Sequence, residues 1–153
     1  YYLTALLCNF KLDIDYTVIS TFILSLKNTD GGFGTIKGSE LATTYYALQI
    51  LHLLHYPLDG FTQTIKYLTQ KMEHANYLEE YFWIVESLSL LKNPIPNKTS
   101  LLSFLIACQK STGGFARSQF IGIANIEQTY QAVSILKLLE TRNLALFKYA
   151  YRI

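Results

Sequence analysis

Few side chains in this sequence have the types and spacing that chemistry requires. His52, His55 and His74 show no spacing typical of a metal-ligand set, and we expect them on the surface or in loops. Cys8 and Cys108 lie outside any Cys-x-x-Cys or Cys/His pattern, so we expect small buried hydrophobic side chains in a reducing compartment such as the cytoplasm. The sequence has no Gly-rich nucleotide loop, Ser/His/Asp arrangement or paired-His motif. It therefore predicts neither a metal site nor a catalytic residue within this chain.

An internal repeat organises the aromatic and basic residues that remain. Residues 22–33, ending in Asp-Gly-Gly-Phe, recur 82 residues later at 104–115, ending in Thr-Gly-Gly-Phe. Each copy is followed by a Thr-Tyr pair, at 44–45 and 129–130, which opens a long apolar segment. A weaker copy without glycines lies between them, so the unit has about 41 residues, half of the 82-residue offset.

Each unit is expected to form a helix, a loop and a second helix. The first helices keep apolar residues at i, i+3, i+4 and i+7. The second helices are apolar nearly all round, as expected if one face packs on the first helix and another lines an interior. No alternation of apolar and polar residues is long enough to indicate a β-strand instead of a helix. The sequence predicts an all-α fold of tandem helical hairpins.

Polar residues, glycines and prolines mark the expected helix boundaries. The Gly-Gly pairs at 31–32 and 113–114 suit a helix C-terminus that needs positive φ. The prolines fall between units, where a second helix must stop: Pro57, Pro94 and Pro96. Polar caps are expected before the first helices: Asp13 or Asp15, Asp59, and Asn97 or Thr99.

Length and composition fit one globular domain. Of 153 residues, 50% are apolar, 14% aromatic and 16% charged. The apolar runs are interrupted well before the ~20 residues that a membrane-spanning helix needs. The net charge of +2 comes from scattered residues, which disfavours nucleic-acid binding. Because both ends fall inside expected helices, residues 1–153 are predicted to be a single repeat domain that is incomplete at both ends.

Two segments carry a family resemblance. Residues 81–96 contain Tyr-Phe-Trp-Ile, a Leu-Leu end and a Pro-Ile-Pro turn, and residues 104–115 contain Cys-Gln and Gly-Gly-Phe. In this order they resemble a repeat of protein farnesyl- and geranylgeranyltransferase β subunits. The spacing from Gln109 to Phe115 also resembles the QW motif of squalene and hopene cyclases, with Phe for Trp. The resemblance implies part of an α/α toroid, a partial α/α barrel whose inner helices line an aromatic funnel for an isoprenoid diphosphate.

The resemblance assigns aromatic residues to the wall of that funnel. Trp83 matches the family's wall tryptophan, while Tyr130, Tyr45 and Tyr81 match aromatic positions at the starts of inner helices. Such a wall would bind a polyisoprene through buried area, at about 25 cal/mol per Å², and would stabilise an allylic cation by cation–π attraction. The alternative is that these side chains are ordinary core aromatics.

The resemblance also implies residues for the diphosphate and for zinc. Arg117 and Lys37 lie in the loops where the family carries basic residues, and solvated loop charges are the alternative. Asn125 stands where one family repeat has a diphosphate-contacting histidine. The family holds zinc with an Asp-x-Cys and a later His. Here Glu127 keeps a carboxylate, but Thr129 replaces the Cys. We expect no cofactor in this fragment, with zinc possible in the complete protein.

Three functions remain open from the sequence. The first is a prenyltransferase β-subunit-like protein that binds an isoprenoid diphosphate, with missing repeats or a partner subunit closing the ring. The second is a non-catalytic toroid that binds protein or lipid. The third is a terpene cyclase fragment, for which Asp13-Ile14-Asp15 approaches the cyclase acid motif but lacks its last Asp, so that helix capping explains it better.

Overall fold

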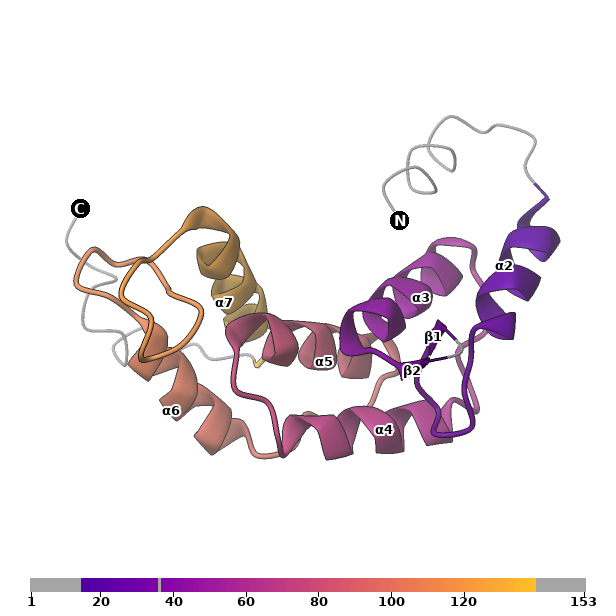
Figure 1. Ribbon diagram of the computed structural model, residues 1–153, viewed down its shortest axis with the longest axis horizontal. Coiled ribbons are helices and arrows are strands. Elements are labelled where there is room, and N and C mark those ends of the chain that lie inside the picture. The colour runs from indigo at the N-terminus through magenta and orange to yellow at the C-terminus, as the bar shows by residue number, and fades with distance from the viewer. Residues whose placement is uncertain (1–14, 36, 140–153) are drawn as a thin grey trace.

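The chain forms a curved array of helical hairpins. The computed structural model describes residues 15–35 and 37–139. Figure 1 shows α3, α5 and α7 as an inner row and α2, α4 and α6 as an outer row. The predicted all-α fold and the three successive hairpins are thus confirmed. The helices are α2 (Tyr16–Ser25), α3 (Leu41–Leu53), α4 (Thr62–Met72), α5 (Leu78–Leu90), α6 (Lys98–Cys108) and α7 (Ile126–Leu138).

One short β-hairpin interrupts the helices. β1 (Gly34–Thr35) pairs antiparallel with β2 (Gly38–Ser39), with Gly34 opposite Ser39 and Thr35 opposite Gly38. Two-residue strands are too short to show the alternation by which strands are recognised in a sequence, so this hairpin was not expected. Among the described residues, no helix has the length and apolar composition needed to cross a bilayer.

The caps of the outer helices agree only in part with the prediction. Asp15 caps α2, because its Oδ1 accepts from the N–H groups of Thr17 at 2.9 Å and Val18 at 3.3 Å. Asp13 lies outside the described residues. The prediction of Asp59 was wrong, since Phe61 occupies the N-cap of α4. Asn97 holds the N-cap position of α6 with φ 50°, but its side chain makes no capping hydrogen bond.

A hydroxyl group at the fourth residue of each inner helix forms a hydrogen bond with the backbone of the loop before that helix. Thr44 Oγ1 accepts from the N–H of Phe33 at 2.9 Å, and Thr129 Oγ1 accepts from the N–H of Phe115 at 3.1 Å. Both hydroxyls also donate to the carbonyl four residues earlier, at the helix N-cap. In the middle hairpin, which lacks Gly-Gly-Phe, the fourth residue is Tyr81, whose hydroxyl donates to the carbonyl of Ala75 at 3.0 Å. We call these three contacts the hydroxyl locks.

The two Gly-Gly pairs lie within the loops and not at the ends of the helices. α2 ends at Ser25 and α6 at Cys108, several residues before the Gly-Gly pairs, so the predicted C-terminal position was wrong. The predicted positive φ is confirmed at Gly31 (93°) and Gly113 (88°). At Gly31 the loop also approaches α4 closely, since a Cβ there would lie 2.3 Å from the backbone of Gln63.

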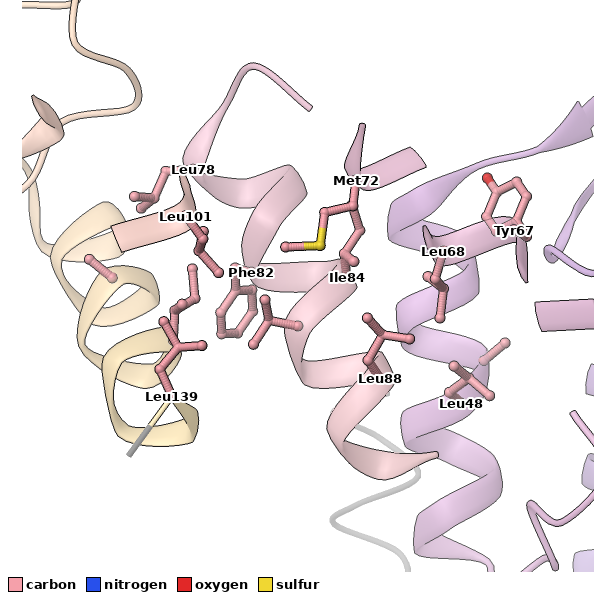
Figure 2. Close-up of a cluster of buried hydrophobic side chains, with 14 of the residues drawn as sticks. Leu48, Tyr67, Leu68, Met72, Leu78, Phe82, Ile84, Leu88, Leu101 and Leu139 are labelled. Atoms are coloured by element: carbon pink, nitrogen blue, oxygen red, sulfur yellow. The ribbon is translucent and has the colours of Figure 1, made fainter. Parts of the chain in front are cut away.

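The core lies between the inner and outer rows. Figure 2 shows buried side chains converging from α3, α4, α5 and α6 and from the end of α7. Cys108 belongs to this core as a free thiol, and burial raises its pKa to about 11. The expectation of a small buried hydrophobic side chain is confirmed for Cys108, while Cys8 lies outside the described residues.

α7 has an uncovered face, which we call the open edge. Ile126, Tyr130 and Val133 on this face are 86%, 65% and 55% exposed. The equivalent residues of α5 are buried, because α7 packs against that side of α5. The open edge therefore has the composition of a helix–helix interface, and no helix among the described residues covers it.

Two glycines with similar backbones test the close approach of the first loop to α4. Gly31 and Gly60 both have positive φ, 93° and 85°, but a Cβ at Gly60 would meet no atom within 4 Å. Gly60→Ala is expected to cost only the backbone strain, roughly 1–2 kcal/mol. Gly31→Ala adds a clash with backbone atoms and is expected to cost about 3 kcal/mol or more. Urea unfolding measures both, and equal losses would contradict the packing of the loop on α4.

Candidate functional site

The inner helices run in the same direction and in register. α3, α5 and α7 have 13 residues each. The starts of α3 and α5 line one pocket. The N–H of Leu78, the first residue of α5, donates to the carbonyl of Arg117 in the loop before α7 at 2.9 Å. The N-termini of the inner helices therefore lie along one edge of the array, which we call the rim.

An aromatic band crosses the inner row one turn below the rim. It consists of Tyr46, Tyr45, Phe82 and Tyr130, the last three of which are the fifth residues of their helices. Successive ring centroids are 5.1, 5.5 and 6.0 Å apart. These separations are typical of tilted and edge-to-face aromatic pairs. Two predicted site residues, Tyr45 and Tyr130, thus belong to one row of ring contacts, in which the central ring, Phe82, is buried and Tyr130 is the exposed end at the open edge.

Trp83 lines a pocket between the starts of α3 and α5. The pocket has a volume of about 420 Å³ and contains side chains of both charges. Trp83 is half-buried and packs against the core. Its surroundings combine apolar area with polar groups, as binding sites do. The other lining residues are Ser39, Glu40, Leu41, Ala42, Tyr67, Lys71, His74, Ala75 and Glu80.

One side of α5 carries two carboxylates beside Trp83. Glu79, Trp83, Glu86 and Leu90 are spaced by four, three and four residues, so they share one side of the helix, and none of them is fully buried. Burial raises the pKa of Glu86 above its usual 4.5, and the charge of Lys137 opposes this rise. A partly desolvated carboxyl group therefore lies on the inner surface, three residues after the tryptophan.

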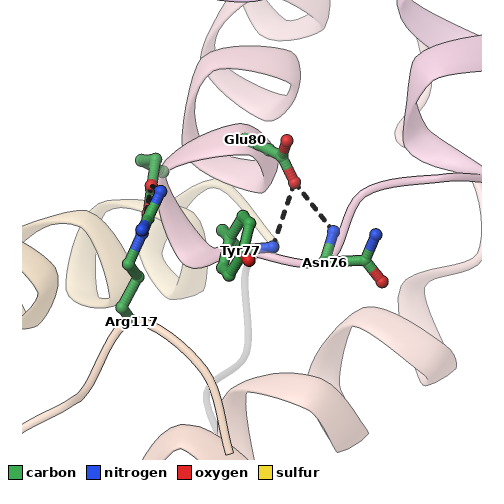
Figure 3. Close-up of polar contacts among 5 residues, drawn as sticks. Asn76, Tyr77, Glu80 and Arg117 are labelled. Carbon is green, nitrogen blue, oxygen red and sulfur yellow. Dashed lines mark hydrogen bonds and ion pairs between the residues drawn. The ribbon is translucent and has the colours of Figure 1, made fainter. Parts of the chain in front are cut away.

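Arg117 is already paired. Its guanidinium forms an ion pair and a hydrogen bond with Oε1 of Glu79 at 2.5 Å and lies 4.0 Å from the ring centroid of Tyr77. Figure 3 shows this arrangement at the start of α5, where Glu80 accepts from the backbone N–H groups of Asn76 and Tyr77. The hydrogen bond that Arg117 donates to Glu79 raises the pKa of Arg117. The predicted basic residue thus lies at the rim, but an anion would have to share it with Glu79.

The remaining predicted residues occupy separate positions. Tyr81 lies two residues before Trp83, hence on a different side of α5, and its ring packs on Phe104 of α6 at 4.7 Å. Asn125 caps α7 by accepting from the N–H of Gln128 at 2.9 Å. Glu127 is exposed in the first turn of α7, and Lys37 is exposed in the turn between β1 and β2. The structure brings none of these four side chains into the aromatic band or the Trp83 pocket, and their roles toward a ligand stay predictions.

Sequence reasoning missed Phe82, Glu79 and Glu86. Phe82 could have been found from its position, because it follows the fourth helix residue as Tyr45 and Tyr130 do. Glu86 stands out as a charge in an otherwise apolar stretch of α5, on the side that Trp83 shares. Within residues 15–35 and 37–139, no three His, Cys, Asp or Glu side chains gather in a way that could hold a metal ion.

The curved double row, with α3, α5 and α7 inside and α2, α4 and α6 outside, defines an α/α toroid-type protein. The chain matches the model of the prenyltransferase alpha-alpha toroid domain over residues 1–77 and 61–150. It belongs to this family.

A solved structure has the same fold. The structure "Candida albicans protein geranylgeranyltransferase-I complexed with GGPP" matches 87% of this chain with a TM-score of 0.73 and 22% sequence identity. The chain spans 45% of the matched chain, somewhat less than half. A comparison with curated proteins finds no match.

The half-buried Glu86 gives the fold a pH dependence. Its folded-state pKa lies above the 4.5 of the exposed side chain, so its contribution to stability is complete below about pH 4 and decreases as the pH rises through the folded pKa. Glu86→Gln removes the cost of ionisation, so we expect a higher melting temperature at about pH 7 and little change at about pH 4.

Glu73 provides a control, because it is an exposed glutamate at the end of α4. Glu73→Gln should leave the dependence of melting temperature on pH unchanged. A Glu86→Gln protein that melts below the wild type at neutral pH would show that the ionised carboxylate is needed by the fold.

Proposed function

We propose that this chain forms the isoprenoid-binding wall of a prenyltransferase β-subunit-like protein. The aromatic band is the observation that carries the proposal, because its ring contacts link all three inner helices. The likeness to a prenyltransferase solved with GGPP supports it. The free, buried Cys108 is compatible with the reducing compartment, such as the cytoplasm, that the sequence predicts.

The wall would bind the hydrocarbon chain through buried area and ring faces. Each Å² of apolar surface removed from water contributes about 25 cal/mol, without any need for directional contacts. Tyr45 and Tyr130 lie on either side of the buried Phe82, so a long hydrocarbon chain could contact the rings of α3 and α7 together. An allylic cation that forms near these rings would be stabilised by cation–π attraction.

The rim would bind the diphosphate. The parallel N-termini of α3, α5 and α7 place the positive ends of their helix dipoles at this edge. Arg117 lies at the same edge, and Lys37 lies in the loop that leads to α3. Glu79 competes for Arg117, so a diphosphate would have to replace the carboxylate as its partner.

Transfer of the prenyl group would require a zinc site from outside the described residues. Zinc would lower the pKa of an acceptor thiol and make it a nucleophile at neutral pH. This chain's own part is to hold the isoprenoid and exclude water from its reactive end. The repeats or the partner subunit that would close the ring stay part of this proposal.

A second candidate is a non-catalytic toroid that binds protein or lipid. The pairing of Arg117 with Glu79 favours it, because the arginine already has an anionic partner. Metal analysis of the full-length protein separates the two candidates. Stoichiometric zinc supports the transferase, and its absence supports the binding protein.

Trp83 is the single tryptophan of the chain, so its fluorescence reports on ligands at the inner surface. Farnesyl or geranylgeranyl diphosphate is expected to change its emission and to release heat in calorimetry. Trp83→Ala should weaken the binding of both the diphosphate and the matching alcohol. Arg117→Gln should weaken binding of the diphosphate alone, by about tenfold, since a charge-assisted hydrogen bond is lost.

Lys92 serves as a matched control, because it is an exposed cation just beyond the other end of α5. Lys92→Gln should leave both affinities unchanged. If neither isoprenoid produces heat with the folded full-length protein, the proposal fails. If Arg117→Gln weakens the alcohol as much as the diphosphate, the anion site does not involve Arg117.

A further inference from the structure

The pair of Arg117 and Glu79 joins an accessible cation to a mostly covered carboxylate. Nε and Nη2 of Arg117 both lie 2.5 Å from Oε1 of Glu79. The arginine side chain is 48% exposed, whereas the glutamate side chain is 14% exposed. A dissolved anion can therefore reach the guanidinium, where it meets Glu79 as an existing partner.

This pair satisfies only one of the two carboxylate oxygens of Glu79. Both nitrogens of Arg117 share Oε1, whereas Oε2 is buried and accepts no hydrogen bond from any described residue. A bidentate pair would use both oxygens, and a buried acceptor without a donor costs free energy. The contact is therefore weaker than a bidentate pair, and release of Glu79 would let Oε2 regain hydrogen bonds from water.

Two contacts hold Arg117 at the rim independently of Glu79. Its backbone carbonyl accepts from the N–H of Leu78 at 2.9 Å. Its guanidinium lies 4.0 Å from the ring centroid of Tyr77, and Figure 3 shows this ring beside the arginine. Arg117 is thus expected to remain at the start of α5 when Glu79 turns away.

Glu80, the neighbouring carboxylate, is already engaged with the backbone. Its Oε2 accepts from the N–H groups of Asn76 at 2.8 Å and Tyr77 at 3.0 Å. The hydrogen bond to Glu79 has the largest effect in raising the pKa of Arg117, and the charge of Glu80 adds a smaller rise. An anion at Arg117 would therefore be repelled by two carboxylates on the first turn of α5.

Glu79 is an internal competitor for any anion that approaches Arg117. Because it belongs to the same chain, it acts like a dissolved competitor at a concentration on the order of millimolar. A carboxylate or a monophosphate makes contacts similar to those of Glu79 and gains little by replacing it. A diphosphate carries more charge and more oxygens, so it can form a bidentate contact with Arg117 and add the attraction of its second phosphate.

We propose that Glu79 is a specificity-determining residue, which keeps carboxylates and monophosphates from Arg117 and is replaced there by a diphosphate. The inference rests on the proposed function in one respect, because it places the diphosphate at Arg117. It goes further in assigning the choice among anions to the competing carboxylate and not to the cation that binds them.

Isothermal titration of the full-length protein with inorganic phosphate and inorganic pyrophosphate tests the inference. We expect the wild type to bind pyrophosphate at least about tenfold more tightly than phosphate, since at least one charge-assisted hydrogen bond is gained. Glu79→Gln should bind phosphate about tenfold more tightly than the wild type, but pyrophosphate by less than about threefold. The preference for pyrophosphate should therefore shrink.

Two further variants separate this role from a general effect of charge. The double variant Glu79→Gln/Arg117→Gln should lose the gain in phosphate binding, because the gain requires the freed guanidinium. Glu73→Gln removes the same charge from an exposed residue at the end of α4 and should change either affinity by less than about twofold. Thermal melts show that each variant is folded. An unchanged preference in Glu79→Gln, or the same change in Glu73→Gln, would overturn the inference.

Geranylgeraniol tests the proposed function separately, because this alcohol has no anion to place on Arg117. Its binding is measured from the fluorescence of Trp83. If the alcohol does not bind but Glu79→Gln binds phosphate more tightly, the isoprenoid proposal fails and the role of Glu79 stands. If the alcohol binds but the preference among anions does not change, the role of Glu79 fails alone.

Discussion

The arrangement of each hairpin depends on one hydroxyl group, the fourth residue of its inner helix. In the first and third hairpins this hydroxyl accepts from the N–H of the loop phenylalanine and donates to the carbonyl at the helix N-cap. Buried backbone groups must be paired, so this bridge fixes how the loop enters the helix. Once the loop is fixed, the next residue of the helix reaches the aromatic band. The middle hairpin keeps the hydroxyl in Tyr81 and bonds a different carbonyl.

The order of the helical hairpins could be predicted because it depends on the periodicity of apolar residues and of the repeat. The residues at which the helices begin and end could not. The repeat offset and the prolines defined three hairpins, and the structure has them in that order. Asp59 was wrong as a cap because tertiary packing determines where α4 begins. Phe61 holds the N-cap and stacks on Phe33 at 6.4 Å, and no sequence window contains that contact. The β1–β2 hairpin was missed because two-residue strands have no period.

Residues of the candidate site could be predicted only where their position within one helix, or their equivalence between repeats, was enough to place them. The resemblance pointed to Trp83, and the structure places it in a pocket between the starts of α3 and α5, which residues of α4 also line. The repeat placed Tyr45 and Tyr130 at equivalent positions, which the structure joins through Phe82. The pairing of Arg117 with Glu79 joins residues 38 apart, so no local pattern reveals it. Tyr81 was predicted as a wall residue because it resembled aromatic positions at the starts of inner helices. The structure places it at the position of the two threonines, and its role toward a ligand stays a prediction.

The distribution of contacts determines how the arc can deform. Among the described helices, the most extensive contacts run along the inner row, from α3 to α5 and from α5 to α7, while each of α2 and α4 packs mainly on its own inner partner. Bending stiffness is therefore concentrated on the concave side, and the outer helices can separate or approach with little repacking. A small rotation at each inner contact would add up along the row and change the curvature of the array.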